Sequence, residues 1–255
     1  MGLIGEILVW HETHLDMILV PAGLLMFAVY NGCLLHTILT HPHTTFIGIN
    51  AIHRRAWVEA ITKEGMKQGI LAVQTIRNGM MAATLMASTT IVLCSVIGLL
   101  LGARLGGSLS EFTLYGMSGS LTSCVKCMML LLSLLAAFLC HVQCVHYYSH
   151  VSFLITIPPA TPEMQNAHVE YVSRAFNKGA HFWSVGLIAF NLSLALFMWN
   201  FGPIPMFVSS CLLLLFQHSL DRPITNLGVN YPNYPEQKER ARSLSELMGI
   251  PRGFL

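Results

Sequence analysis

Long apolar stretches dominate the pattern of hydrophobic and polar positions along this chain. A helix needs about 20 apolar residues to cross roughly 30 Å of hydrocarbon, and five stretches come close to or exceed that length. They cover residues 17–39, 70–102, 121–157, 180–201 and 206–220. Polar or turn-forming residues separate them, among them Pro158-Pro159 and the run Gly202-Pro203-Ile204-Pro205, which makes a tight hairpin of the last two. The pattern predicts an all-α fold: a polytopic transmembrane helical bundle with five spans.

Composition and charge favour the same class of protein. Of the 255 residues 54% are hydrophobic and only 10% are charged, whereas a soluble domain carries about 25% charged residues. With five spans and the N-terminus outside, 12 of the 14 Lys and Arg residues fall on the inner side, and only Arg104 and Lys126 fall outside. The positive-inside rule favours this orientation. It makes residues 1–16 a short extracytoplasmic segment, residues 17–222 the bundle and residues 223–255 a cytoplasmic tail.

The same features indicate partners and location. A lipid bilayer is the expected surrounding, and five spans with short loops hardly enclose a wide path alone, so we expect a homo-oligomer. The net charge of +2 is too balanced for a nucleic-acid partner. The topology fits the plasma membrane or another secretory-pathway membrane.

Four shorter features complete the organisation. The loop between the first two spans places Ile52, Ala56, Ala60 and Ile61 at helical spacing among charged residues, which predicts a cytoplasmic helix over residues 52–66 along the inner membrane face. A charged helix is expected over residues 235–248 of the tail. Gly98, Gly102 and Gly106 form small-xxx-small steps, which we expect to pack within the bundle, with dimerisation as the alternative. Lys126 is expected to extend toward the outer water layer.

Polar residues at the start of the second span are the first candidate site. Gln74, Arg77 and Asn78 lie together at about the depth of the inner leaflet. Polar groups in a membrane are costly, so they usually face a cavity or a partner. Arg77 therefore either reaches for lipid phosphates or belongs to a pore or an anion-binding site.

Histidines are the second candidate. The chain has 12, and His146 and His150 are four residues apart, so they share a helix face and are able to bind one metal ion or to line a pore. A haem needs axial ligands from facing helices, for which we consider His36, His146, His150, His181 and His218. The metal candidates are His146, His150 and His181. The alternatives are interfacial histidines that bond carbonyls and headgroups, or a proton-linked role.

Catalytic motifs are missing from the sequence. We find no nucleophile elbow, zinc-protease motif, Walker loop or dinucleotide-binding glycine pattern. Cys124 and Cys127 have redox spacing, but no thioredoxin-like βαβ pattern surrounds them. We therefore predict no enzyme activity and no cofactor, and the paired histidines leave a metal or haem as the open alternative.

Several segments together resemble a known membrane family. They are Thr44–Asn50 with Arg55–Ala60, Ile70–Asn78, Ala87–Thr89, His146–Phe153 and Phe201–Phe207. In order and spacing they resemble the family catalogued as domain of unknown function 599, in its land-plant form, over about residues 15–222. The resemblance implies a multi-pass membrane protein and carries no settled biochemical activity. The chain departs from the family at His146 and Ile188, where many members have Arg.

The resemblance and the polar residues together define the candidate site and three hypotheses. The residues shared with the family are Arg55, Trp57, Glu59, Gln74, Arg77 and Asn78, to which we add His146 and His150 as pore or binding candidates. The leading hypothesis is a channel or transporter subunit for a small ion or solute. The second is a redox membrane protein with His-ligated haem or metal. The third is a non-catalytic membrane regulator or scaffold that binds partners through residues 52–66 and the tail.

Overall fold

The computed structural model describes residues 2–41, 45–64, 66–105, 120–159 and 161–221. The described residues form six α-helices and one 3₁₀ turn, with no strand among them: α1 (Gly2–Thr40), α2 (Phe46–Glu64), α3 (Met66–Leu105), α4 (Ser120–Leu154), η2 (Pro162–Met164), α5 (Gln165–Met198) and α6 (Pro203–Asp221). Five of them, α1, α3, α4, α5 and α6, are long and apolar enough to cross a membrane. The prediction of an all-α bundle with five spans is confirmed. Which side each end faces stays a prediction, and the tail lies outside the described residues.

The spans are joined by turns that the sequence makes recognisable. The helix α4 ends at Leu154, ahead of Pro158-Pro159, because proline lacks the N–H that helix continuation requires. Between α5 and α6 the chain reverses at Gly202, whose φ is 140°. Side chains rarely adopt that backbone conformation, so a glycine suits this reversal.

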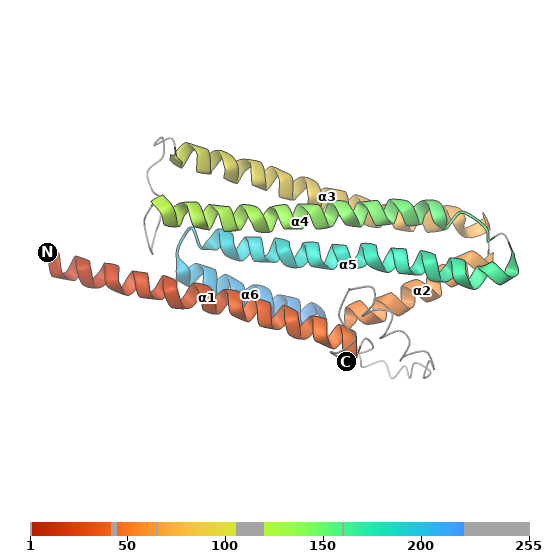
Figure 1. Cartoon of the computed structure of the whole chain (residues 1–255), viewed down its shortest axis with the longest axis horizontal. Coiled ribbons are helices and arrows are strands. Elements are labelled where there is room, and N and C mark those ends of the chain that lie inside the picture. The colour runs from red at the N-terminus through yellow and green to blue at the C-terminus, as the bar shows by residue number, and fades with distance from the viewer. Residues whose placement is uncertain (1, 42–44, 65, 106–119, 160, 222–255) are drawn as a thin grey trace.

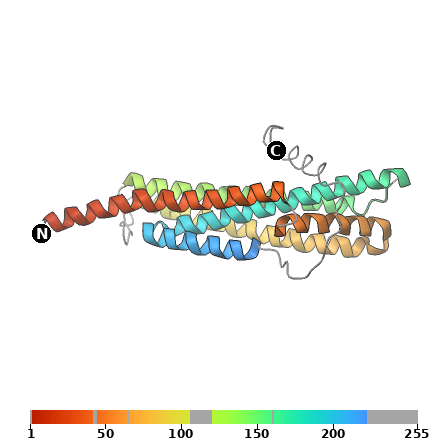
Figure 2. The same cartoon turned by 90° about the horizontal axis from the view of Figure 1, so that it is seen from below.

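Four helices are much longer than a bilayer requires: α1, with 39 residues, and the three that form one antiparallel layer. The helices α3, α4 and α5 contain 40, 35 and 34 residues, or about 60, 52 and 51 Å at 1.5 Å per residue. The helices α1 and α6 lie beside one half of this antiparallel layer, and α2 lies beside the other half (Figures 1 and 2). We refer to them as the α6 half and the α2 half.

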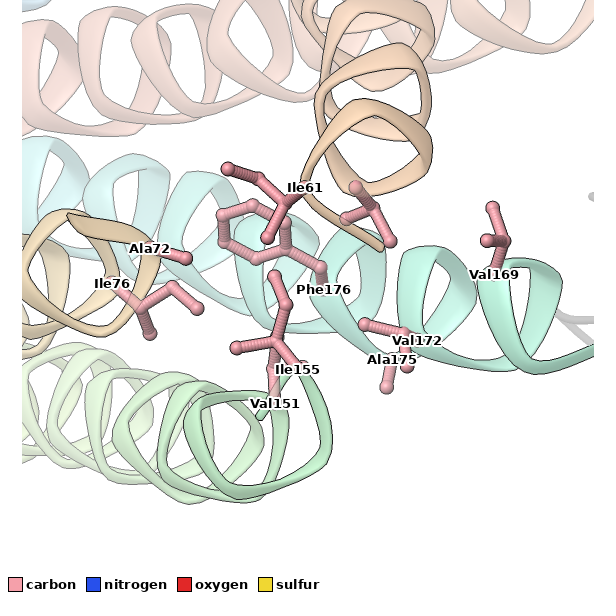
Figure 3. Packing of buried hydrophobic residues seen from close by; sticks show 10 residues of the cluster. Ile61, Ala72, Ile76, Val151, Ile155, Val169, Val172, Ala175 and Phe176 are labelled. Carbon is pink, nitrogen blue, oxygen red and sulfur yellow. The ribbon is translucent and has the colours of Figure 1, made fainter. Parts of the chain in front are cut away.

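Each half has its own buried core. In the α6 half the core consists of Val20, Ile97, Leu130, Leu134, Leu196 and Met206, contributed by all five long helices. In the α2 half it consists of Val58, Ile61, Ala72, Ile76, Val151, Ile155, Val169, Val172, Ala175 and Phe176 (Figure 3). The α2 half is therefore a packed helical layer and not a set of frayed helix ends.

Exposed apolar side chains show where lipid surrounds the bundle. Most of the large exposed hydrophobic residues occupy positions 17–35 of α1, 81–100 of α3, 125–142 of α4, 185–198 of α5 and 204–220 of α6. The others are Phe46, Ile70, Leu71, Phe153, Ile157, Met164 and Tyr171. These stretches correspond to about 20–30 Å of helix, close to the thickness of a bilayer core. Within them the only Asp, Glu, Lys or Arg is Lys126. We refer to this region, which coincides with the α6 half, as the apolar belt.

Polar side chains join α1 to α6 at the end of the belt nearer α2. Gln217 Nε2 donates a hydrogen bond to Asn31 Oδ1 at 3.0 Å, and the Tyr30 hydroxyl donates to Asp221 Oδ2 at 2.9 Å. Farther along, Gly23 leaves room for Ser210, whose Oγ lies 3.5 Å from a Cβ built at that glycine. The pairing of α1 with α6 thus combines close approach with specific hydrogen bonds.

The helix of the first loop differs from the prediction. It begins at Phe46 instead of residue 52 and ends at Glu64, and it packs against α3 and α5 (Figure 1). Its place along the inner membrane face stays a prediction. Its buried side chains include Val58 and Ile61, whereas Ala56 and Ala60 are exposed. The predicted apolar face was therefore partly wrong: it included the exposed Ala56 and Ala60 and left out the buried Val58.

Candidate functional site

Charged side chains of α2 and α5 meet in the α2 half. Arg55 Nη2 lies 3.1 Å from Glu170 Oε2, and Arg174 Nε lies 2.7 Å from Glu170 Oε1. One carboxylate thus serves two arginines. Glu59 pairs with Lys63 one turn along α2 at 2.8 Å, and this hydrogen bond lowers the pKa of the Glu59 carboxyl.

Arg54, the neighbour of Arg55, lies in a different environment. Its Nε donates to Asn177 Oδ1 at 2.8 Å, and its guanidinium carbon lies 5.9 Å from the centre of the Phe176 ring. Its Nη2 is buried and has no hydrogen-bond partner. Among the described residues no carboxylate forms an ion pair with it. Burial lowers the pKa of the guanidinium, but an arginine remains charged in proteins.

The surroundings of Arg54 come from three helices. Asn177 and His181 are one turn apart on α5, and Arg54 interacts electrostatically with His181 and with Tyr148 of α4. Trp57, one turn from Arg54 on α2, packs on Phe176 with ring centres 5.8 Å apart. The arrangement places one positive charge, held by an amide oxygen and an aromatic face, between α2, α4 and α5. Chemically it suits an anion with oxygen acceptors.

The predicted polar strip lies on the outside of the bundle. Gln74, Arg77 and Asn78 are all exposed on α3, directly beyond the belt. Small and polar side chains continue the same exposed face of α3 through the belt at steps of three, four or seven residues: Gln74, Arg77, Thr84, Ser88, Ser95, Gly98 and Gly102. Met81 and Ile91 are the larger members of this face. A Cβ added at Gly98 or Gly102 would meet no atom within 4 Å, so the prediction that these glycines pack within the bundle was wrong. We refer to the seven residues as the α3 stripe.

The candidate histidines are distributed over four helices: His36 lies on α1, His146 and His150 on α4, His181 on α5 and His218 on α6. His146 and His150 are both exposed on α4, and His150 Nε2 lies 3.2 Å from the Tyr171 hydroxyl. His181 is partly buried on α5 near Arg54. In the described part of the chain, no three His, Cys, Asp or Glu side chains come together as metal ligands.

Comparison with known proteins identifies the family. The family described as "Protein of unknown function, DUF599" matches residues 18–225. The chain belongs to the DUF599 family. Comparison with curated proteins and with solved structures finds no match. The family fixes no reaction for this DUF599 protein, so its function has to be argued from its own residues.

Arg54 of this DUF599 protein was not among the predicted site residues, although the sequence carries a signal for it. Arg54, Val58 and Ile61 follow the spacing i, i+4, i+7, which places the arginine on the buried face of α2. The candidates of the sequence analysis thus fall into separate places. One group lies on α2 and consists of Arg55, Trp57 and Glu59. The other forms an exposed surface of α3 and consists of Gln74, Arg77 and Asn78.

A second group of residues was missed at the opposite end of the belt. Lys126 has only 1% of its surface exposed, and its Nζ lies 5.3 Å from the centre of the Trp199 ring. Trp199 Nε1 donates to Asp16 Oδ1 at 3.1 Å, and Asp16 is also buried. The expectation that Lys126 extends to water was wrong, because its ammonium group lies against an aromatic ring within the protein.

Proposed function

We propose that this protein is the subunit of a homo-oligomeric channel or transporter for a small ion or solute, in which the α3 stripe lines the path. The observation that carries the proposal is the outward position of this stripe. Its small and hydroxyl-bearing side chains run along the belt, where neighbouring exposed positions such as Leu85 and Leu99 are large and apolar. The hydroxyls of Thr84 and Ser95 donate to carbonyls of their own helix, and their oxygens can still accept hydrogen bonds from water. A water-filled path between copies would use this capacity and the room beside the glycines, whereas lipid would use neither.

Arg77 gives the proposed path a charge preference. It is exposed at the end of the stripe nearer α2, next to Gln74 and Asn78. A fixed positive charge at the mouth of a path raises the local concentration of anions and lowers that of cations. We therefore propose that small anions pass more readily than cations of similar size.

Flux through vesicles tests this function. The full chain is reconstituted, and chloride and potassium fluxes are compared with those of empty vesicles. Ser95→Trp on the stripe is expected to reduce flux by about tenfold or more, because a bulky side chain closes a narrow path. Leu132→Trp, at an exposed belt position of α4 outside the stripe, is the matched control and should leave flux within about twofold of wild type.

The charge preference has its own variants. Arg77→Gln should lower the ratio of chloride to potassium flux, and Arg77→Lys should retain it, because lysine keeps the charge. A wild-type protein without flux above empty vesicles would refute the function. Equal effects of Ser95→Trp and Leu132→Trp would refute the assignment of the path to α3.

The other hypotheses stay predictions. A His-ligated redox protein and a membrane scaffold have no observation among the described contacts that favours them over the channel or transporter. Three further expectations also stay proposals: location in the plasma membrane or another secretory-pathway membrane, the homo-oligomeric state, and the land-plant form of the family.

A further inference from the structure

We propose that Arg54 forms a binding site for a phosphate group between α2, α4 and α5, just beyond the apolar belt. The contrast between two consecutive arginines carries this inference. Arg55 has 30% of its side chain exposed and pairs with Glu170. Arg54 is partly buried, and its charge meets no carboxylate among the described residues. A half-buried charge without a counter-ion is costly in proportion to its burial, so an anion at this guanidinium would stabilise it.

The geometry of the guanidinium defines what binds. A guanidinium carries five donors in a planar fork. Asn177 Oδ1 occupies Nε, and the Phe176 ring lies near the guanidinium carbon. The two Nη groups remain, and Nη2 is buried without a hydrogen-bond partner. Two parallel donors of this kind match two oxygens of one phosphate group.

Position along the bundle favours phosphate over other oxyanions. Asn177 lies eight residues beyond Val185, the exposed belt residue of α5 nearest to it, which corresponds to about 12 Å. Lipid phosphates occupy the layer that adjoins the hydrocarbon core. The site is therefore within reach of a lipid headgroup and of dissolved phosphate, and both present the same oxygens.

Neighbouring side chains support the same chemistry. His181 and Tyr148 interact electrostatically with Arg54, and both carry hydrogen-bond donors of the kind that phosphate sites use. The carboxylates that the structure pairs on α2 and α5 are already engaged: Glu59 with Lys63, and Glu170 with Arg55 and Arg174. A phosphate at Arg54 therefore competes with no carboxylate that the structure places on that guanidinium.

Titration calorimetry of the full chain in dodecyl maltoside, a detergent without a phosphate group, tests the site. Inorganic phosphate and soluble dihexanoyl phosphatidic acid are titrated separately into wild type, Arg54→Gln, Arg54→Lys and Arg55→Gln. We expect Arg54→Gln to weaken binding about tenfold or more, since a charge-assisted bidentate pair is lost. Arg54→Lys should weaken binding less, because it keeps the charge without the fork. Arg55→Gln is the matched control and should stay within about twofold, because its charge is already paired on the surface.

The two ligands distinguish the source of the phosphate. If both ligands bind and both need Arg54, the site recognises the phosphate group itself. If only phosphatidic acid binds in this way, the site is for a lipid. If only inorganic phosphate does, the site is for a soluble anion. No binding of either ligand to wild type overturns the proposal, and so does an Arg54→Gln affinity equal to that of wild type. If Arg54→Gln does not fold, equal affinities of Arg54→Lys and Arg55→Gln overturn it instead. The site does not depend on the proposed path along α3, so the flux results leave it unaffected.

Discussion

Replacing Gly179 with alanine tests the packing that holds α3, α4 and α5 together. A Cβ built at Gly179 would lie 2.6 Å from Cδ1 and Cε1 of the Tyr148 ring, and one built at Gly79 would lie 2.8 Å from Cε2 of the same ring. The ring of Tyr148 thus fits between a glycine of α3 and a glycine of α5. Because both sides are closed, the ring has little room to move away from an added methyl group.

The expected magnitude follows from two opposing effects. Overpacking by a methyl group costs about 1–3 kcal/mol, whereas replacing glycine by alanine inside a helix gains up to about 1 kcal/mol. Gly179→Ala should therefore lower the free energy of unfolding by about 1–2 kcal/mol. Gly32→Ala is the matched control: its Cβ meets no atom within 4 Å, so it should be neutral or stabilising by up to about 1 kcal/mol.

Thermal unfolding of both variants in the same detergent is the assay. The expected fall in Tm for Gly179→Ala is roughly 2–8 °C, from about 2–4 °C per kcal/mol for a chain of this size. Added to Tyr148→Leu, the Gly179→Ala change should lower Tm much less than it does in the wild type, because the clashing ring is gone. If Gly179→Ala proves as stable as Gly32→Ala, the described packing of Tyr148 between the two glycines is wrong.

Three further predictions concern polar contacts. Glu170→Gln removes the carboxylate charge that Arg55 and Arg174 share, yet should lower the free energy of unfolding by only about 1 kcal/mol because these pairs are partly exposed and screened. Unfolding at low and high salt checks this, and a loss of stability that does not depend on salt would contradict it. Gln217→Ala should loosen α1 from α6 by about 0.6–2 kcal/mol, and a double-variant cycle with Asn31→Ala should show coupling; additive losses would speak against the hydrogen bond. The lowered pKa of Glu59 makes a small contribution to stability above the carboxyl's unfolded pKa, which is lost as pH falls through the folded value. The Tm difference between wild type and Glu59→Gln should therefore shrink in acid, and a difference that stays constant with pH would refute this.

Hydropathy was sufficient to predict the helices, because a bilayer imposes a length and a composition on each span. The ends of α5 show the limit of that signal: the predicted span begins at residue 180, whereas the helix begins at Gln165. Residues 165–179 pack against α2, α3 and α4 in the core of the α2 half, which stabilises them as a helix. A hydropathy window that searches for lipid-facing residues does not detect the part of a helix that continues into a polar layer.

Tertiary contacts explain the errors at individual residues. Lys126 is buried because Asp16 and Trp199, distant in the sequence, meet at the same level of the bundle. Gly98 and Gly102 are exposed because the buried face of α3 includes Ala83, Ala87 and Ile97 instead. Spacing within one helix shows which residues share a face, but only the arrangement of the neighbouring helices decides which face is covered.

The two arginines at the α2 end of the belt allow the two proposals to be separated. Gly79 and Gly179 both contact the Tyr148 ring. Arg77 lies two residues from Gly79, and Asn177, which binds Arg54, lies two residues from Gly179, so the two arginines are at a similar depth. They differ in surroundings, since Arg77 is exposed on α3 whereas Arg54 lies between α2 and α5. Arg77→Gln should therefore change ion selectivity and leave phosphate affinity unchanged, and Arg54→Gln should do the reverse. If each variant changed both properties, phosphate site and path would be one connected site, and the separation of the two surfaces would be wrong.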